Sequence, residues 1–204
     1  VGLGPAEAGL MLRLPARVGL ALGRGLTLGT LLERVSTVHG SRTLVVEPGT
    51  GMALTMAEAA LLVDGWAGAI AKVTSLGDRV VIATPNSYEQ LLLTLAASRA
   101  GRIPAPVNSQ MAKGEVRHVV KDSGASLVIT DATELPGSDG FGSAVATDPR
   151  AVAALFYTSG TTGKPKGAEL SHAGLLGGLS LAAMVPTELH RDEIVLALPL
   201  AHIF

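Results

Sequence analysis

The chain has 204 residues, of which 48% are hydrophobic and 3% aromatic, and its formal net charge is −1 at pH 7. It is long enough to bury a hydrophobic core, and its balanced charge gives no electrostatic reason to expect nucleic acid as a partner. The chain contains no cysteine, which excludes disulfides, thiolate metal sites and cysteine nucleophiles.

Residues 1–26 form an N-terminal segment whose apolar positions are interrupted by Arg13, Arg17 and Arg24. No apolar run reaches the roughly 18 residues that a transmembrane helix needs, and the interspersed charges fit a signal peptide poorly. Pro15 would start or break a helix in the middle of the segment. Two interpretations stay open: a segment that packs on the domain, which the proline favours, or an interfacial helix in peripheral contact with a membrane.

From Thr27 onward, the sequence predicts short helices and strands in alternation. Thr55 followed by Glu58 is a capping box, which predicts the start of a long helix. A continuous apolar run after Arg79 predicts a strand covered on both faces. The predicted elements are, in chain order, a helix from Thr27 to Gly40, strands over Thr43–Glu47 and Ala53–Thr55, a helix over Met56–Ser75, a strand over Arg79–Thr84, a helix capped by Asn86 or Ser87 and ending at Ala100, a strand over Ile103–Val107, a helix over Lys113–Asp122 and a strand over Ser126–Thr130.

This alternation is typical of an α/β fold with a mostly parallel sheet flanked by helices. Residues Ala132–Arg150 are rich in Gly, Ser, Asp and Pro and lack periodicity, so we expect a plain connecting loop there. An apolar strand is then predicted over Ala153–Tyr157.

That strand runs directly into Thr158–Gly167, a segment rich in glycine, hydroxyl groups and lysine. Glycines allow the backbone to approach a ligand closely, and backbone N–H groups, hydroxyls and ammonium groups all bind anionic oxygen. The segment is not a Walker A loop, because the spacing of its glycines is too short and Pro165 follows Lys164 where Ser or Thr is required. By composition alone, a solvated surface loop is the alternative; otherwise the segment predicts a polyphosphate site.

The string Tyr-Thr-Ser-Gly-Thr-Thr-Gly-Lys-Pro-Lys-Gly over residues 157–167 resembles the signature of the adenylate-forming superfamily, which includes acyl-CoA synthetases, peptide-synthetase adenylation domains and luciferases. Other segments resemble further motifs of that family: Gly77–Val81, Pro85–Ser87, Ala100–Asn108, Asp122–Ala125, Glu169–His172 and Asp192–Phe204. The resemblance covers nearly all of residues 27–204. It implies that these residues are a partial N-terminal large domain of the adenylate-forming fold, and residues 1–26 lie outside it.

The resemblance implies ATP-dependent activation of a carboxylic acid, by default a fatty acid, to an acyl-adenylate and then to a thioester of coenzyme A. Mg²⁺ would come with ATP, because no His/Asp/Glu cluster has metal-ligand spacing. Phosphate binding is expected from the described signature: Thr158, Ser159, Gly160, Thr161, Thr162, Gly163, Lys164, Lys166 and Gly167. Lys166 is favoured over Lys164 as the fixed charge.

His202 is expected beside the pocket for the acyl group and the adenylate, with a strand-end histidine held by its neighbours as the alternative. Ala201 precedes it where the family often has an aromatic residue, which puts the gating of the substrate channel in question. The other histidines are expected to be surface or packing residues: His39, His118, His172 and His190.

Elements that the family carries later, including a small C-terminal lid domain with a catalytic lysine, have no counterpart in these residues. We therefore expect the 204-residue chain to be a truncated part of a cytoplasmic ligase, inactive by itself, with membrane association left open. Two alternatives remain: a ligase that loads a carrier-protein thiol, or a non-catalytic ATP-binding or structural fragment.

Overall fold

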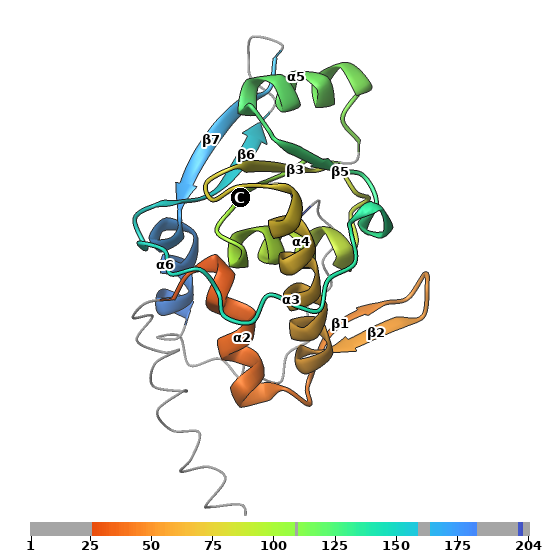
Figure 1. The fold of residues 1–204 in the computed structure, drawn as a ribbon, viewed down its shortest axis with the longest axis vertical. Coiled ribbons are helices and arrows are strands. Elements are labelled where there is room, and N and C mark those ends of the chain that lie inside the picture. The colour runs from red at the N-terminus through yellow and green to blue at the C-terminus, as the bar shows by residue number, and fades with distance from the viewer. Residues whose placement is uncertain (1–25, 109, 159–163, 183–199, 202–204) are drawn as a thin grey trace, which may run out of the picture.

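The computed structural model describes residues 26–108, 110–158, 164–182 and 200–201. Its elements, shown in Figure 1, are in chain order α2 (Leu28–His39), β1 (Thr43–Glu47), β2 (Met52–Thr55), α3 (Met56–Val73), β3 (Arg79–Ile82), α4 (Tyr88–Arg99), β4 (Ile103–Pro106), α5 (Lys113–Ser123), β5 (Leu127–Ile129), a 3₁₀ helix (Ala132–Glu134), β6 (Val152–Thr158), β7 (Lys166–Ser171) and α6 (His172–Ala182). Each helix and strand predicted between Thr27 and Thr130 is present, with small shifts at the ends.

The centre of the fold is a parallel sheet with strand order β4-β3-β5. Val80, Val81 and Ile82 of the middle strand are completely buried. Val80 and Ile82 belong to the larger hydrophobic core, whereas Val81 belongs to a smaller core on the other face. The prediction of a strand covered on both faces is therefore confirmed, and Figure 1 shows α5 on one side of the sheet and α2, α3 and α4 on the other.

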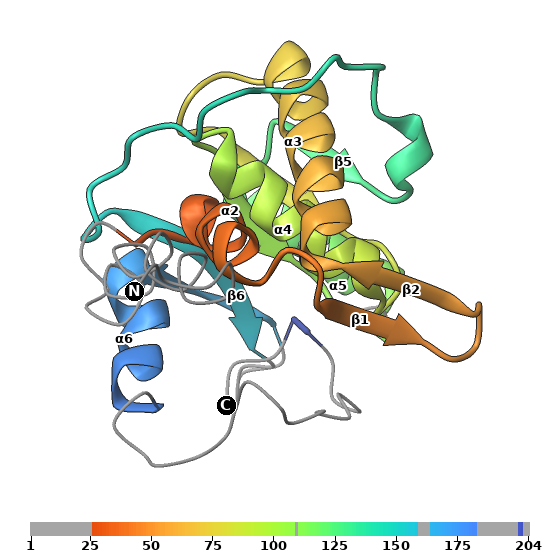
Figure 2. The same cartoon turned by 90° about the horizontal axis from the view of Figure 1, so that it is seen from below.

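Helix α3 begins at the predicted capping box. The Thr55 hydroxyl accepts a hydrogen bond from the Glu58 N–H at 3.2 Å, and the Glu58 carboxylate accepts one from the Thr55 N–H at 2.8 Å. These two bonds satisfy N–H groups that the first turn of a helix leaves without intrahelical partners. The helix then packs against α2 and α4, and Figure 2 shows the three side by side while the β1–β2 hairpin projects from the start of α3.

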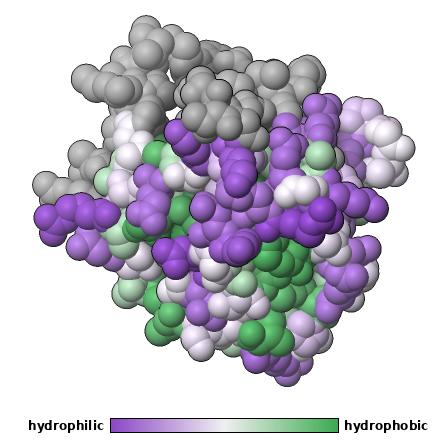
Figure 3. Space-filling model, turned by 90° about the horizontal axis from the view of Figure 1, so that it is seen from above, coloured by the Kyte–Doolittle hydropathy of each residue, from purple (hydrophilic) through white to green (hydrophobic). Residues whose placement is uncertain are grey.

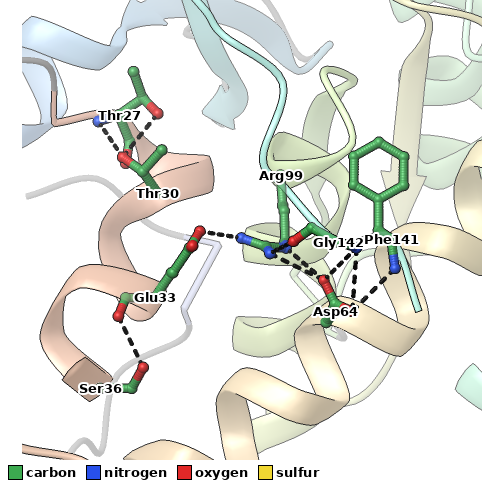
Figure 4. Close-up of polar contacts among 8 residues, drawn as sticks. All are labelled: Thr27, Thr30, Glu33, Ser36, Asp64, Arg99, Phe141 and Gly142. Carbon is green, nitrogen blue, oxygen red and sulfur yellow. Dashed lines mark hydrogen bonds and ion pairs between the residues drawn. The ribbon is translucent and has the colours of Figure 1, made fainter.

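A buried arginine joins three helices and a loop. Arg99 of α4 donates to Glu33 of α2 at 2.6 Å and to Asp64 of α3 at 3.0 Å, and it also donates to the carbonyl of Gly142 (Figure 4). Asp64 in turn accepts hydrogen bonds from the N–H groups of Phe141 and Gly142. The polar contacts therefore fix the segment around residue 141 onto the helices.

The connection from Ala132 to Arg150 is irregular apart from one 3₁₀ turn, as predicted, but it is not a plain solvated linker. Lys72 of α3 donates to the carbonyl of Gly137 at 2.6 Å, and the N–H of Val145 donates to the carbonyl of Arg99 at 3.0 Å. Composition missed this packing because the segment binds through backbone groups, which leave no hydrophobic periodicity in the sequence.

The expected α/β fold with a parallel sheet flanked by helices is confirmed, and β6 and β7 form a separate antiparallel pair. The parallel part is confined to β3, β4 and β5, while the two predicted strands β1 and β2 form an antiparallel hairpin. In the described ranges, no helix combines the length and the apolar character needed to cross a membrane.

Candidate functional site

The segment expected to bind phosphate connects β6 to β7. Thr158 is the last residue of β6 and pairs with Lys166, while Tyr157 pairs with Gly167. The strands therefore extend into the predicted loop from both ends, and β7 begins at Lys166 rather than after Gly167. Of the expected phosphate-binding residues, the structure brings together Thr158, Lys164, Lys166 and Gly167, whose side chains or backbone are exposed.

The remaining expected residues lie outside the described ranges: Ser159, Gly160, Thr161, Thr162, Gly163 and His202. Their roles stay predictions from the sequence.

Tyr157 anchors the end of β6 to α5. Its side chain is 5% exposed, and its hydroxyl donates to the Asp122 carboxylate at 2.8 Å. Burial, together with this carboxylate, raises the pKa of Tyr157 to about 12. The hydroxyl is therefore protonated at neutral pH and keeps its role as the donor in this bond.

Gly167 is required by its close approach to that tyrosine. A Cβ atom at this position would lie 3.0 Å from Cζ of the Tyr157 ring and 3.2 Å from its hydroxyl oxygen. Any larger side chain would displace the ring or the strand. The glycine lets β7 pass directly over the side chain of Tyr157, one residue before the end of β6, and the two ends of the segment are held together there.

Two lysines lie on either side of a buried proline at the start of β7. Lys164 and Lys166 are exposed, whereas Pro165 is buried. Within the described part of the chain, no carboxylate lies within ion-pair distance of either lysine. The ammonium groups are thus available to an anion, while the backbone between them is fixed.

The fixed point between the lysines is a contact with α5. Nε2 of His118 lies 3.0 Å from the carbonyl oxygen of Pro165. Because a carbonyl can only accept, Nε2 carries the proton, and the hydrogen-bond network assigns this tautomer. Sequence reasoning placed His118 among surface or packing residues, and no local signal could have revealed a partner so far along the chain.

His172 fixes the other end of β7. The residue is 3% exposed, and Nδ1 accepts a hydrogen bond from the N–H of Leu28 at 3.0 Å. Burial lowers the pKa of His172, which agrees with a neutral ring that accepts at Nδ1. The expected packing role of His172 is confirmed, and the strand-to-helix exit after Leu170 is joined to the first turn of α2.

Leu200 and Ala201, the described part of the segment Asp192–Phe204, meet the turn after β3. The N–H of Leu200 donates to Oδ1 of Asn86 at 2.8 Å, and Ala201 is 4% exposed. Asn86 was expected as one of two candidate caps of α4, but the N-cap position belongs to Ser87, whose side chain makes no capping bond. The Asn86 side chain instead accepts a hydrogen bond from the backbone of Leu200, two residues before His202.

Among the residues that the structure describes, no group of three or more His, Asp or Glu side chains could hold a metal ion. The candidate site consists of hydroxyl, ammonium and backbone groups at the two ends of the β6–β7 connection. Hydrogen bonds of Tyr157 and His118 connect these two ends to α5.

Comparison with known proteins is consistent with this arrangement. The profile of the family described as AMP-binding enzyme matches residues 32–142 and 136–204. The long-chain-fatty-acid–CoA ligase FadD13 of Mycobacterium tuberculosis is 29% identical over 206 residues, covering 86% of this chain and 41% of that protein. A feruloyl-CoA synthase of Amycolatopsis is 34% identical over 173 residues, covering 74% of this chain and 35% of that protein.

The structure is similar to that of o-succinylbenzoate CoA synthetase (MenE) from Bacillus subtilis in complex with its acyl-adenylate intermediate. The TM-score is 0.73 at 25% identity, covering 84% of this chain and 50% of that chain. The chain thus spans half or less of the length of these relatives. Because the family profile matches most of the chain, over residues 32–142 and 136–204, the chain belongs to the family of AMP-binding enzymes.

Proposed function

We propose that this chain is the phosphate-binding part of an AMP-forming acid–thiol ligase. The ligase would activate a carboxylic acid with ATP to an acyl-adenylate and then transfer the acyl group to coenzyme A. Support comes from the family and from the relatives, which are named as CoA ligases and synthases. The observation that carries the proposal is the β6–β7 hairpin, which is held to α5 through Tyr157 and Pro165 and exposes Thr158, Lys164 and Lys166 at its end.

The described residues fit a polyphosphate. Lys164 and Lys166 supply positive charge, and in the part of the chain that the structure describes no carboxylate forms an ion pair with either of them. The Thr158 hydroxyl is exposed and can donate to a phosphate oxygen.

In the proposed reaction, a carboxylate attacks the α-phosphorus of ATP and pyrophosphate leaves. Charge increases on the departing pyrophosphate, so donors and cations fixed beforehand stabilise the transition state more than the ground state. We propose that Lys166 provides this charge, with Thr158, Lys164, Gly167 and residues 159–163 around the β- and γ-phosphates. Mg²⁺ bound with ATP would supply further positive charge at the same oxygens.

We further propose a fatty acid as the substrate, since the relative with the longer matched segment is a long-chain-fatty-acid ligase. The relative with the higher identity is a feruloyl-CoA synthase, so an aromatic acid is the main competitor. His202 is proposed beside this acyl group. Residues 27–204 are proposed as part of the N-terminal large domain, in a cytoplasmic enzyme, and peripheral contact of residues 1–26 with a membrane stays a prediction.

The test is acid-dependent exchange of labelled pyrophosphate into ATP by the protein that contains this chain. A panel of fatty, aromatic and dicarboxylic acids would be compared, followed by addition of coenzyme A. Exchange with one acid class and thioester formation support the proposal. Exchange without thioester formation would indicate a carrier-protein acceptor instead, and no exchange with any acid would indicate a non-catalytic role.

A further inference from the structure

We propose that α5 positions the phosphate-binding segment, with His118 and Asp122 as the positioning residues. This inference rests on the proposed function of the β6–β7 connection. Helix α5 lies on the face of the parallel sheet opposite α2, α3 and α4 (Figure 1).

The two residues hold the two ends of the segment. They lie one helical turn apart, so their side chains project from the same face of α5. Asp122 accepts the hydroxyl of Tyr157, the residue directly before Thr158, at 2.8 Å. His118 lies 3.0 Å from the carbonyl oxygen of Pro165, the residue between the two lysines.

Val119, which follows His118, anchors the helix itself. Val119 is completely buried and belongs to the smaller hydrophobic core, together with Val81 of β3 and Tyr157. Because α5 is packed on the parallel sheet through this core, its two polar contacts connect the hairpin to the most buried part of the fold. Leu155 and Tyr157 of β6 belong to the same core, so β6 also packs on the sheet directly, and the two polar contacts of α5 fix the residues at the two ends of the β6–β7 connection.

Such anchoring matters for catalysis of phosphoryl chemistry, which depends on groups held in place before the reaction. Neither contact competes with the ligand, since the His118 ring and the Asp122 carboxylate bind protein groups rather than the exposed lysines. Both residues therefore act through Pro165 and Tyr157, and they would not touch the nucleotide.

The test compares variants that remove each contact with variants that keep it. His118→Ala and Asp122→Ala lose the side-chain partner, whereas His118→Gln keeps an N–H donor and Asp122→Asn keeps an oxygen acceptor. Arg117→Ala is the matched control, because Arg117 is an exposed neighbour of His118 on the same helix. Hydrophilic residues cover much of the α5 end of the molecule (Figure 3), so a surface substitution there is expected to be tolerated.

Two measurements are made on the protein that contains this chain: hydrogen exchange of the backbone amides of residues 157–158 and 166–167 without nucleotide, and the KM values for ATP and for the acid in pyrophosphate exchange. We expect both alanine variants to exchange faster at these amides and to raise the KM for ATP about tenfold, as expected for one lost hydrogen bond. The KM for the acid should stay unchanged, and Gln, Asn and the Arg117→Ala control should behave like the wild type.

Unchanged amide exchange in both alanine variants would overturn the anchoring itself, whatever the enzyme does. Suppose that the wild-type protein catalyses pyrophosphate exchange and that the alanine variants show faster amide exchange but an unchanged KM for ATP. This result would overturn the positioning role and leave the proposed function intact. A wild-type protein without pyrophosphate exchange would instead remove the proposed function and, with it, this role of α5.

Discussion

Arg99 and Asp64 form an ion pair between α4 and α3, in which Nε of the arginine lies 3.0 Å from Oδ1 of the aspartate. The two side chains are 7% and 26% exposed. Burial by itself would raise the pKa of Asp64, but hydrogen bonds from the Phe141 N–H and from Arg99 outweigh it and hold this pKa below the ordinary value of 3.8. The carboxylate is therefore charged at neutral pH and complements the buried guanidinium.

Replacement of Arg99 by alanine should strongly destabilise the fold. It would leave Asp64 without its charged partner and remove the contacts to Glu33 and Gly142, so we expect a loss of about 3–5 kcal/mol. Urea denaturation measures this loss. Glu33→Gln is the control, because the Glu33 side chain is 50% exposed and water can replace much of its contact with Arg99, so we expect a loss of only about 0–1 kcal/mol. Equal losses in the two variants would show that the buried pair is not the important contact.

Two glycines one turn apart on α3 should respond in opposite directions to alanine. A Cβ atom at Gly68 would lie 2.1 Å from Oγ of Ser138 and 2.6 Å from the carbonyl oxygen of Gly140, whereas nothing lies within 4 Å of one at Gly65. We expect Gly68→Ala to cost about 1–3 kcal/mol through overpacking. Gly65→Ala should add about 0.5–1 kcal/mol, because alanine favours the helix. Thermal denaturation of both variants tests whether the segment after Ala132 really packs on α3; a stabilising Gly68→Ala would contradict it.

His172 should make stability depend on pH. Its folded-state pKa lies below the ordinary value of 6.5, so the unfolded state binds the proton more readily. Stability is therefore complete above about pH 6.5 and falls as the pH drops through the window between 6.5 and the lower folded-state pKa. Protonation of Nδ1 would also break the bond from the Leu28 N–H.

The comparison for this prediction is His172→Gln, which removes the titrating group. We expect the free energy of unfolding of the variant to change less between pH 7 and pH 5 than that of the wild type, measured by urea denaturation at each pH. Parallel curves for the two proteins would mean that His172 does not cause the dependence.

Local patterns in the sequence predicted the elements well where one residue type has one structural reason. Thr55 and Glu58 form the expected cap, and Gly124 ends α5 with a φ of 63°, which glycine adopts without strain. Gly40 also follows the end of α2 as predicted, but its φ is −52°. The glycine is needed there for space, since a Cβ would lie 2.8 Å from the carbonyl oxygen of Ser36.

Long-range contacts could not be predicted in this way. The sequence predicted a phosphate-binding role for Thr158–Gly167, which stays a prediction, but it did not predict the antiparallel pairing of Thr158 with Lys166, which depends on where two strands meet. Likewise, nothing in the sequence indicated the partners of His118 and Asp122, because these partners lie on another element and a single histidine or aspartate is common on helix surfaces. Arg99 was missed for the same reason. Asp122 was noted only as the start of the segment Asp122–Ala125, which resembles a family motif.

The central claim is that the end of the β6–β7 hairpin binds the phosphates of ATP, and Lys166 tests it most directly. The measurement is the KM for ATP and the rate of pyrophosphate exchange for Lys166→Ala in the protein that contains this chain. Lys121→Ala serves as the control, since Lys121 is an exposed lysine of α5 outside the candidate site. We predict that Lys166→Ala loses exchange efficiency by about tenfold to a hundredfold while Lys121→Ala is unchanged. Exchange at the wild-type rate and the wild-type KM in Lys166→Ala would contradict the account.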